Sequence, residues 1–549
     1  MAKRTLYYGG PVITMEEPLY ADALLVKGGK IEAVGSFDEL KGLTASLPVD
    51  DARQVEYRDL KGRTLLPAFL DPHSHFSQYA SSLLQIPLDE TESIPEIQDR
   101  IREFIRGNHT APGQWLIARG YDHNLLAENR HLTRWDLDEA APSNPLLVQH
   151  RSGHLGVFNT LALDELGVTP QTPSPSGGLI GVKDGELTGY MEENAFMEYL
   201  KKAPSPSLDD LTGAFQKVQD RYASYGITTI QDGMIVDQMV PLYKMLLGNH
   251  LLKLDLVGYP GAENSQKFMK EFSHCIKTYQ SRFKIGGYKI FLDGSPQGRT
   301  AWMRAPYLPD SSGQTDYCGY GTMSDEAVLA AVRMAADQGL QLLAHCNGDA
   351  AAEQYLCAFE TAYKESGTAS PKEFTAPLRP VIIHAQLIGA DQLARAAELG
   401  LIPSFFIAHV YYWGDTHIRN FGMERASAIS PASSAKALDI PYTFHQDSPV
   451  LEPNMLETVW CAVNRLTRSG IPLGPDQRIS ALDALKGVTI NAAYQYFEED
   501  RKGSLAPGKL ADLVILGDNP LEVSPEAIRH IPVIETIKEG ETIYRNPDF

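Results

Sequence analysis

The 549-residue sequence has few cysteines and no long apolar run. Its cysteines lie far apart and form no C-x-x-C pair, which argues against a zinc knuckle or a dithiol redox site. The first ten residues lack the apolar stretch of a signal peptide, and no later run approaches membrane-spanning length. The sequence therefore predicts a cytoplasmic protein with no membrane partner.

Positive charge is also scarce, since 49 Lys and Arg residues face 69 Asp and Glu residues and leave a net charge of −20. The resulting negative field opposes binding to phosphate backbones, so nucleic acid is not expected as a partner. No G-x-S-x-G motif and no phosphate-binding glycine loop occur, which removes the basis for a serine hydrolase or a nucleotide-binding protein. The hydrophobic fraction of 43% is that of a globular chain with a sizeable core.

Short apolar stretches separated by glycine turns occupy both ends of the chain, for example Ala23–Val26 before Gly28-Gly29 and Leu510–Leu516 before Gly517. The two ends are therefore expected to pair. We predict a small β-sandwich domain built from residues 1–64 and 498–549.

Between the ends, apolar strand-like pieces alternate with helical ones, which is typical of a parallel α/β sheet or barrel. Eight such pieces match the strand number of a (β/α)8 TIM-like barrel, predicted over residues 65–497. Residues 81–220 interrupt the alternation and are predicted to be an insertion after the first barrel strand. The expected strands lie at residues 64–70, 227–230, 252–258, 287–292, 340–344, 380–383, 401–405 and 441–444.

The first of these strands ends in two histidines, His73 and His75, separated by Ser74. Alternate side chains of an extended segment face the same way, so the two imidazoles can hold one metal ion. An H-x-H pair on its own is a weak signal, and a pair of polar loop residues would look the same.

A lysine, Lys289, lies within the apolar run of the fourth strand. An unpaired ammonium is costly there, so Lys289 should lose its charge or meet an acid. A desolvated lysine can react with carbon dioxide to give a carbamate whose oxygens could bridge two metals. A simple ion pair with Asp232 or Asp293 is the competing interpretation.

The fifth, sixth and eighth strands end in or near His345, His384 and Asp447. Because barrel active sites lie at the carboxyl ends of the strands, this recurrence favours a shared site. Imidazole and carboxylate ligands without cysteine favour zinc, with manganese, nickel or iron as alternatives. The implied chemistry is hydrolysis by metal-activated hydroxide.

Several segments of the sequence resemble the amidohydrolase superfamily and, within it, the amidohydrolase-3 group, which includes proteins similar to N-substituted formamide deformylase and to exoenzyme regulators. The matching segments are residues 31–35, 66–75, 289–295, 345–350 and 503–513. The resemblance covers nearly the whole chain. It implies a hydrolase that cleaves a C–N bond, of an amide or an N-substituted formamide, in a small molecule.

The resemblance also implies the roles of the site residues. His73 and His75 match the ligands of a first metal, His345 and His384 those of a second, and Lys289 the carboxylated lysine that bridges them, with carbon dioxide as its source. Asp447 matches a ligand of the first metal that also serves as the general base and later protonates the leaving amine. One or two divalent ions, zinc first, are thus expected, and a homodimer is compatible with the sequence.

Substrate contacts are predicted from less specific signals, in the insertion and in the loops that follow the strands. A metal-dependent deaminase is the nearest alternative function, although it would carry a glutamate where Gly348-Asp349 stands and would lack Lys289. A non-catalytic regulatory protein on the same barrel is the other alternative. The candidate substrate contacts are Tyr121, His154, Arg299, His409 and His445.

Overall fold

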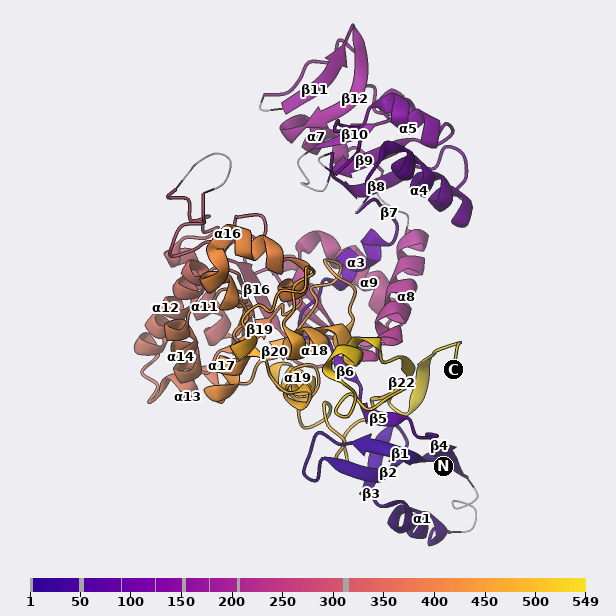
Figure 1. The fold of residues 1–549 in the computed structure, drawn as a ribbon, viewed down its shortest axis with the longest axis vertical. Coiled ribbons are helices and arrows are strands. Elements are labelled where there is room, and N and C mark those ends of the chain that lie inside the picture. The colour runs from indigo at the N-terminus through magenta and orange to yellow at the C-terminus, as the bar shows by residue number, and fades with distance from the viewer. Residues whose placement is uncertain are drawn as a thin grey trace. The chain divides into compact units, whose positions relative to one another are not determined.

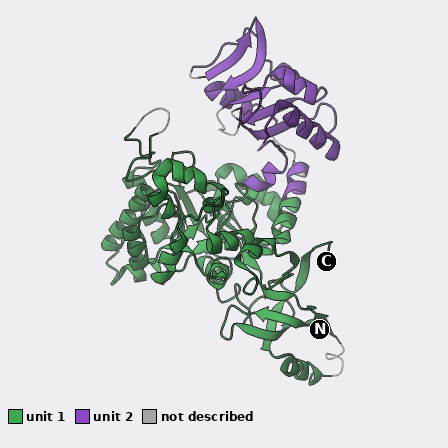
Figure 2. Ribbon diagram, viewed as in Figure 1, with its two compact units in different colours: residues 1–77, 216–549 green, residues 78–215 purple. Residues whose placement is uncertain are grey.

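The computed structural model of the chain describes residues 3–48, 54–89, 91–123, 125–150, 155–176, 178–204, 208–309 and 315–549. The chain divides into two compact units (Figure 2). The first unit combines residues 1–77 with residues 216–549, and the second contains residues 78–215. The predicted insertion over residues 81–220 has nearly the same limits as the second unit.

One eight-stranded sheet joins the two ends of the chain (Figure 1). Its central pairing is antiparallel, between β5 near the N-terminus and β21 near the C-terminus, with Leu66 opposite Val514. The turn between β2 and β3 contains Gly28 and Gly29, both with positive φ, a conformation that glycine adopts without steric cost. The strands of this sheet are β1 (Arg4–Ile13), β2 (Tyr20–Lys27), β3 (Lys30–Gly35), β4 (Val55–Asp59), β5 (Thr64–Pro67), β21 (Leu513–Leu516), β22 (Val533–Lys538) and β23 (Glu541–Arg545).

Parallel strands in the order of the predicted barrel form the centre of the first unit, which confirms the α/β class. Their ladders make two sheets, β15-β14-β13-β6 and β16-β17-β18-β19-β20, and no ladder joins β20 to β6 within the described part of the chain. The strands are β6 (Phe69–Leu70), β13 (Ile227–Ile235), β14 (Asp255–Pro260), β15 (Phe283–Ile285), β16 (Gly287–Phe291), β17 (Gln341–Cys346), β18 (Val381–His384), β19 (Ile402–Phe405) and β20 (Thr443–Phe444).

Two of the expected strands differ from the observed ones. The single strand predicted over residues 64–70 is split, because Thr64–Pro67 pairs with β21 in the terminal sheet whereas Phe69–Leu70 pairs with β13. The expected fourth strand corresponds to β16, which pairs with β17. A separate strand, β15, comes just before it in the sequence and pairs with β14. Apolar composition predicted both runs but could not show which neighbour each half would meet.

Helices separate the parallel strands and pack on their outer side, while apolar side chains such as Val257, Leu343 and Ile383 fill the space between the strands. No helix in the described ranges is both long and apolar enough to cross a membrane. The helices of the first unit, including α3 and α8 at its limits, are α1 (Phe37–Ala45), α3 (Phe76–Ser82), α8 (Leu208–Ser224), α9 (Val240–Gly248), α10 (Gln266–Glu271), α11 (Asp325–Asp337), α12 (Asp349–Ser366), α13 (Pro371–Thr375), α14 (Ala390–Leu399), α15 (His409–Tyr412), α16 (Gly414–Ser427), α17 (Ala432–Ala437), α18 (Met455–Asn464), α19 (Ala481–Gly487) and α20 (Ile490–Gln495), with short 3₁₀ turns η1 (Asp237–Met239), η2 (Ser273–Cys275), η3 (Pro475–Gln477) and η4 (Pro525–His530).

The second unit has its own six-stranded sheet, in the order β11-β12-β10-β9-β8-β7. Strands β7, β8 and β9 are parallel, and the other pairings are antiparallel. Its core includes Ile97, Leu116 and Val148, which are fully or nearly fully buried. Its elements are β7 (Ile86–Pro87), α4 (Ile94–Gly107), β8 (Leu116–Tyr121), α5 (Arg134–Ala140), β9 (Leu146–His150), β10 (Leu155–Phe158), α6 (Thr160–Glu165), β11 (Gly178–Lys183), β12 (Glu186–Glu192) and α7 (Glu193–Leu200).

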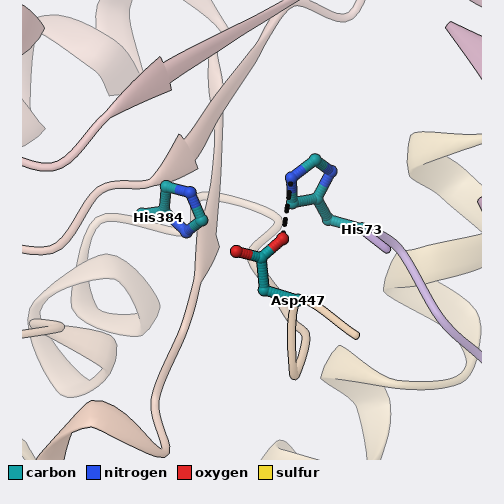
Figure 3. Close-up of side chains that lie close together, drawn as sticks. All are labelled: His73, His384 and Asp447. Carbon is teal, nitrogen blue, oxygen red and sulfur yellow. Dashed lines mark ion pairs between the residues drawn. The ribbon is translucent and has the colours of Figure 1, made fainter. Parts of the chain in front are cut away.

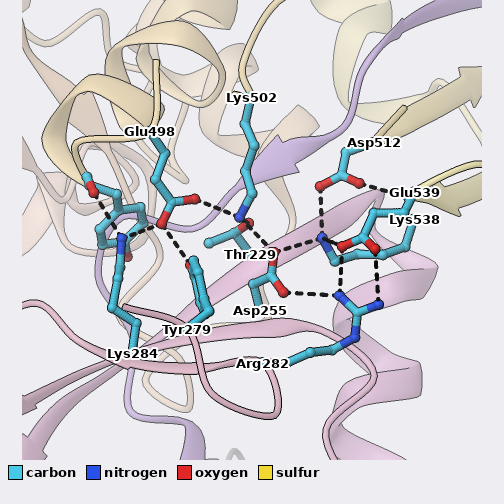
Figure 4. A network of polar contacts seen from close by, with 11 residues as sticks. Thr229, Asp255, Tyr279, Arg282, Lys284, Glu498, Lys502, Asp512, Lys538 and Glu539 are labelled. Atoms are coloured by element: carbon cyan, nitrogen blue, oxygen red, sulfur yellow. Dashed lines mark hydrogen bonds and ion pairs between the residues drawn. The ribbon is translucent and has the colours of Figure 1, made fainter. Parts of the chain in front are cut away.

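A buried ionic network ties the C-terminal part of the chain to the amino ends of the barrel strands (Figure 4). At its centre Asp255, the first residue of β14, accepts from Lys502 at 2.6 Å, Lys538 at 2.7 Å and Arg282 at 3.1 Å. Burial alone would raise the pKa of Asp255, but the charges of Lys502 and Lys538 lower it far below its usual range. Each buried charge of the network thus has an opposite partner, and Arg282 lies at its partly exposed edge.

Replacing the central acid should therefore destabilise the fold. The change Asp255→Asn leaves Lys502 and Lys538 buried with an incomplete partner, and we expect it to lower the free energy of unfolding by about 3–5 kcal/mol. Urea denaturation followed by circular dichroism measures this loss. The matched control is Glu365→Gln, which removes an exposed 2.6 Å pair with Arg333 and should leave the stability nearly unchanged. Equal losses in the two variants would contradict the central role of the network.

Candidate metal centre

Histidine, lysine and aspartate side chains gather at the carboxyl ends of the parallel strands. His73 follows β6, Lys289 lies in β16, His345 lies in β17, His384 ends β18 and Asp447 follows β20. These strands run in one direction, so their ends meet at one edge of the sheets. The candidate residues are thus brought together from parts of the sequence hundreds of positions apart.

The closest group consists of His73, His384 and Asp447, whose ligand atoms lie within 4.8 Å of one another (Figure 3). His73 and His384 are buried, and the Asp447 side chain is 13% exposed. The Nε2 atoms of His73 and His75 each lie 3.3 Å from Oδ1 of Asp447, so His75 joins the same group. Burial alone would raise the pKa of Asp447, but the hydrogen bond from His75 lowers it well below its usual range.

The other nitrogen of His73 has a buried partner in β13. Its Nδ1 lies 2.6 Å from Oε1 of Gln231, whose own amide nitrogen donates to the carbonyl of Pro72 and to the hydroxyl of Tyr496. With its amide fixed in this way, Gln231 accepts a hydrogen bond from Nδ1–H of His73. Burial lowers the pKa of His73 well below its ordinary value, so the ring is neutral and Nε2 offers a lone pair toward Asp447.

His384 is oriented by a second buried histidine. Its Nδ1 lies 3.1 Å from Nε2 of His445, and Nδ1 of His445 lies 3.0 Å from Oγ of Ser404. His445 is fully buried, with both ring nitrogens engaged. This placement favours an orienting role for His445 over the substrate contact that the sequence predicts.

His345 is held by Asp293, through a contact of 3.1 Å between Nδ1 and Oδ1. Asp293 also accepts backbone N–H bonds from Asn347, Gly348 and Trp302, at 3.0, 2.7 and 3.1 Å. The ring of His345 lies 4.5 Å from that of His384, measured between centroids. The side chains of His345, His75 and Asp447 are 15%, 16% and 13% exposed, so solvent reaches the site past these three residues.

Lys289 is 1% exposed, and its Nζ lies 3.4 Å from Nε2 of His73. Within the described ranges, neither Asp232 nor Asp293 forms an ion pair with it, so the simple pairing considered from the sequence is wrong. Burial lowers the pKa of Lys289 from 10.5 to about 7, against the opposing attraction of Asp447. A substantial fraction of the amine is therefore neutral at physiological pH.

The backbone at two strand ends is unusual. His384 and Asp447 have φ values of 69° and 55°, in the left-handed region that residues other than glycine seldom adopt. Such conformations persist where the surrounding structure enforces them, and they cluster at functional sites. Here they turn both side chains toward the common point.

The remaining candidates of the first unit lie in loops. A guanidinium nitrogen of Arg299 donates to the carbonyl of Leu308 at 2.9 Å, and the same guanidinium stacks on Tyr307. His409 is buried, and its Nδ1 lies 3.1 Å from Nε2 of His417. Both residues are placed by these contacts, and their roles toward a substrate stay predictions.

The candidates from the insertion belong to the second unit. Tyr121 ends β8 and is buried, with its hydroxyl 3.3 Å from Nδ1 of His131. His154 lies outside the described residues. The substrate roles of both stay predictions.

Sequence reasoning missed the residues that orient the histidines, Gln231 and Ser404. Each is a buried polar residue inside an apolar strand, and that is the one signal that could have drawn attention to it. Nothing in the sequence indicates which histidine each would meet, because the partners are brought together only by neighbouring strands.

Known proteins resemble the chain over its whole length. The sequence profile of the amidohydrolase family matches residues 56–544. N-substituted formamide deformylase of Arthrobacter pascens is 26% identical over 95% of this chain and 95% of that protein. The putative amidohydrolase YtcJ of Bacillus subtilis is 26% identical over 98% of this chain and 99% of that protein. The crystal structure of an uncharacterized metal-dependent hydrolase from Pyrococcus horikoshii matches with a TM-score of 0.76 and 24% identity, covering 99% of this chain and 100% of that one.

The lowered pKa of Lys289 can be measured on the metal-depleted protein. Cyanate reacts with neutral amines, so carbamylation of Lys289 should rise with pH through a midpoint of about 7, well below the ordinary lysine value. Peptide mapping by mass spectrometry gives the rate at each pH. The Lys289→Met variant identifies the labelled peptide. A midpoint near 10 would show that Lys289 keeps an ordinary pKa.

Proposed function

The chain belongs to the amidohydrolase-3 family of metal-dependent hydrolases, and from that premise we propose that it cleaves the C–N bond of a small-molecule amide or N-substituted formamide. The relative from Arthrobacter pascens, whose name states such an activity, supports this substrate class. The arrangement of the site residues supports the reaction type.

One observation carries the proposal. Nε2 of His73 and Oδ1 of Asp447 lie 3.3 Å apart in a buried site, and Gln231 accepts a hydrogen bond from the protonated Nδ1 on the opposite side of the His73 ring. Two lone pairs thus face each other, an arrangement that costs free energy unless a cation lies between them. The donor set therefore fits a divalent metal ion.

Six residues would hold the metal, and their nitrogen and oxygen donors without thiolate favour zinc. A neutral Lys289 amine reacts with carbon dioxide to form a carbamate, which would add a negative oxygen donor and allow two ions instead of one. A bound divalent ion supplies a Lewis acid that polarises a carbonyl and lowers the pKa of water. The proposed ligands are His73, His75, Lys289, His345, His384 and Asp447.

Asp447 is the proposed general base. Its lowered pKa keeps the carboxylate ionised and able to accept a proton from water, and the same oxygen can then pass that proton to the leaving amine. Gln231 and the Ser404–His445 pair keep His73 and His384 in the tautomers that direct Nε2 toward the site. Arg299, His409, Tyr121 and His154 remain candidates for substrate contact.

The structure offers little support for the deaminase alternative. Asp349, which stands near the position where a deaminase would carry a glutamate, binds the side chain of Arg304 at 3.2 Å and the backbone N–H of the same residue at 2.7 Å. Its carboxylate is thereby committed to a surface pair at the start of α12. Lys289 has no use in a deaminase with a single metal.

The first test of the proposed function measures metal and activity together. We expect the purified protein to hold about one or two equivalents of zinc at this centre, lost in His73→Ala/His384→Ala, and to release amine from at least one member of a panel of formamides and acetamides. Asp447→Asn should lower kcat by about 10²–10⁴-fold, because it removes the proton acceptor. Elemental analysis and an amine-release assay give both readouts. A metal-free and inert wild-type protein would refute the proposal.

The second test concerns Lys289. Lys289→Ala removes the amine that would carry the carbamate, so metal content and activity should both fall, and added short carboxylates such as formate or acetate should restore part of each. Lys289→Arg is the matched control, because it keeps a basic side chain that cannot form the carbamate, and it should not respond to the acids. Unchanged metal content in Lys289→Ala would remove this residue from the site.

A further inference from the structure

A second group of metal-binding side chains lies in the second unit, at the carboxyl ends of two neighbouring parallel strands. In the register of β8 and β9, Tyr121 is opposite His150, the last residue of β9. Asp122 and His123 follow β8 directly. All three side chains therefore meet at one edge of the six-stranded sheet.

The ligand atoms of this group are close together. Nδ1 of His123 lies 3.2 Å from Nε2 of His150, and Oδ1 of Asp122 lies 3.6 Å from the latter and 3.9 Å from the former. Two imidazole nitrogens bound to one tetrahedral zinc at about 2.0–2.1 Å are separated by about 3.3–3.4 Å. The observed separation matches that of two ligands of one ion.

Neighbouring residues keep the imidazoles in place. The ring of His131 lies against that of His123, with centroids 3.9 Å apart, and Tyr121 packs edge-on against His150 at 5.0 Å. Two imidazoles beside a carboxylate form a typical donor set for a borderline divalent ion.

We propose that Asp122, His123 and His150 bind one divalent transition-metal ion of the zinc class. The ion would fasten the segment that follows β8 to the end of β9. All three ligands belong to the second unit, whereas the ligands of the metal centre proposed at the barrel strands belong to the first. A hydrogen bond between His123 and His150 without metal is the competing interpretation.

The test uses the full-length, untagged chain and Zn²⁺ alone. After loading and desalting, His123→Ala and His150→Ala should each contain about one equivalent less zinc than the wild type. The matched control is His131→Ala, which removes an adjacent imidazole outside the group and should keep the wild-type stoichiometry. The His73→Ala/His384→Ala double variant should still bind this equivalent of zinc. Adding His123→Ala to the double variant should remove it.

A second measurement keeps the test valid if a variant folds poorly. Zn²⁺ added to the wild-type protein should slow hydrogen exchange in residues 116–123 and 146–150, and it should do so in the barrel double variant as well. Equal zinc content in wild type, His123→Ala and His150→Ala, or exchange that Zn²⁺ leaves unchanged, would overturn the proposal and leave a histidine pair that is only hydrogen-bonded.

Discussion

Pairing of buried charges at the amino ends of the barrel strands is the interaction that joins the C-terminal part of the chain to the barrel. Four acids and four bases take part, so the charges balance within the chain (Figure 4). The terminal sheet and the barrel share this network, because Lys538 in β22 and Asp255 in β14 belong to it together. The network thus lies at the end of the strands opposite the candidate site. The network consists of Asp255, Glu498, Asp512, Glu539, Arg282, Lys284, Lys502 and Lys538.

At the carboxyl ends of the same strands the buried charges are not balanced. Asp447 is ionised and nearly buried, but burial lowers the pKa values of its neighbours His73, His384 and Lys289. The side chains around Asp447 therefore carry little positive charge. At the amino ends of the strands, in contrast, charged lysines lie beside the acids. A bound cation would balance the charge of Asp447. The charges of the site and the types of its donor atoms therefore both favour a metal ion there.

The sequence predicted those features that depend on local order along the chain. His73, His345 and His384 each end an apolar run, so their place at strand ends followed from the pattern. Gln231, Ser404 and the partners of Asp255 depend on which strands become neighbours, and this is decided by packing across the whole barrel. The split of residues 64–70 has the same origin, since both halves are apolar and only their partner strands, β21 and β13, distinguish them.

The same constraint acts again in the second unit. Parallel strands place whatever follows them at one edge, so a carboxylate and two imidazoles that close β8 and β9 must meet, as the histidines of β17 and β18 do. His345 and His384 stand one register step apart on β17 and β18, and His123 lies two residues beyond Tyr121, the residue opposite His150. The two proposed cation sites therefore share one geometric origin, in side chains that end or follow neighbouring parallel strands.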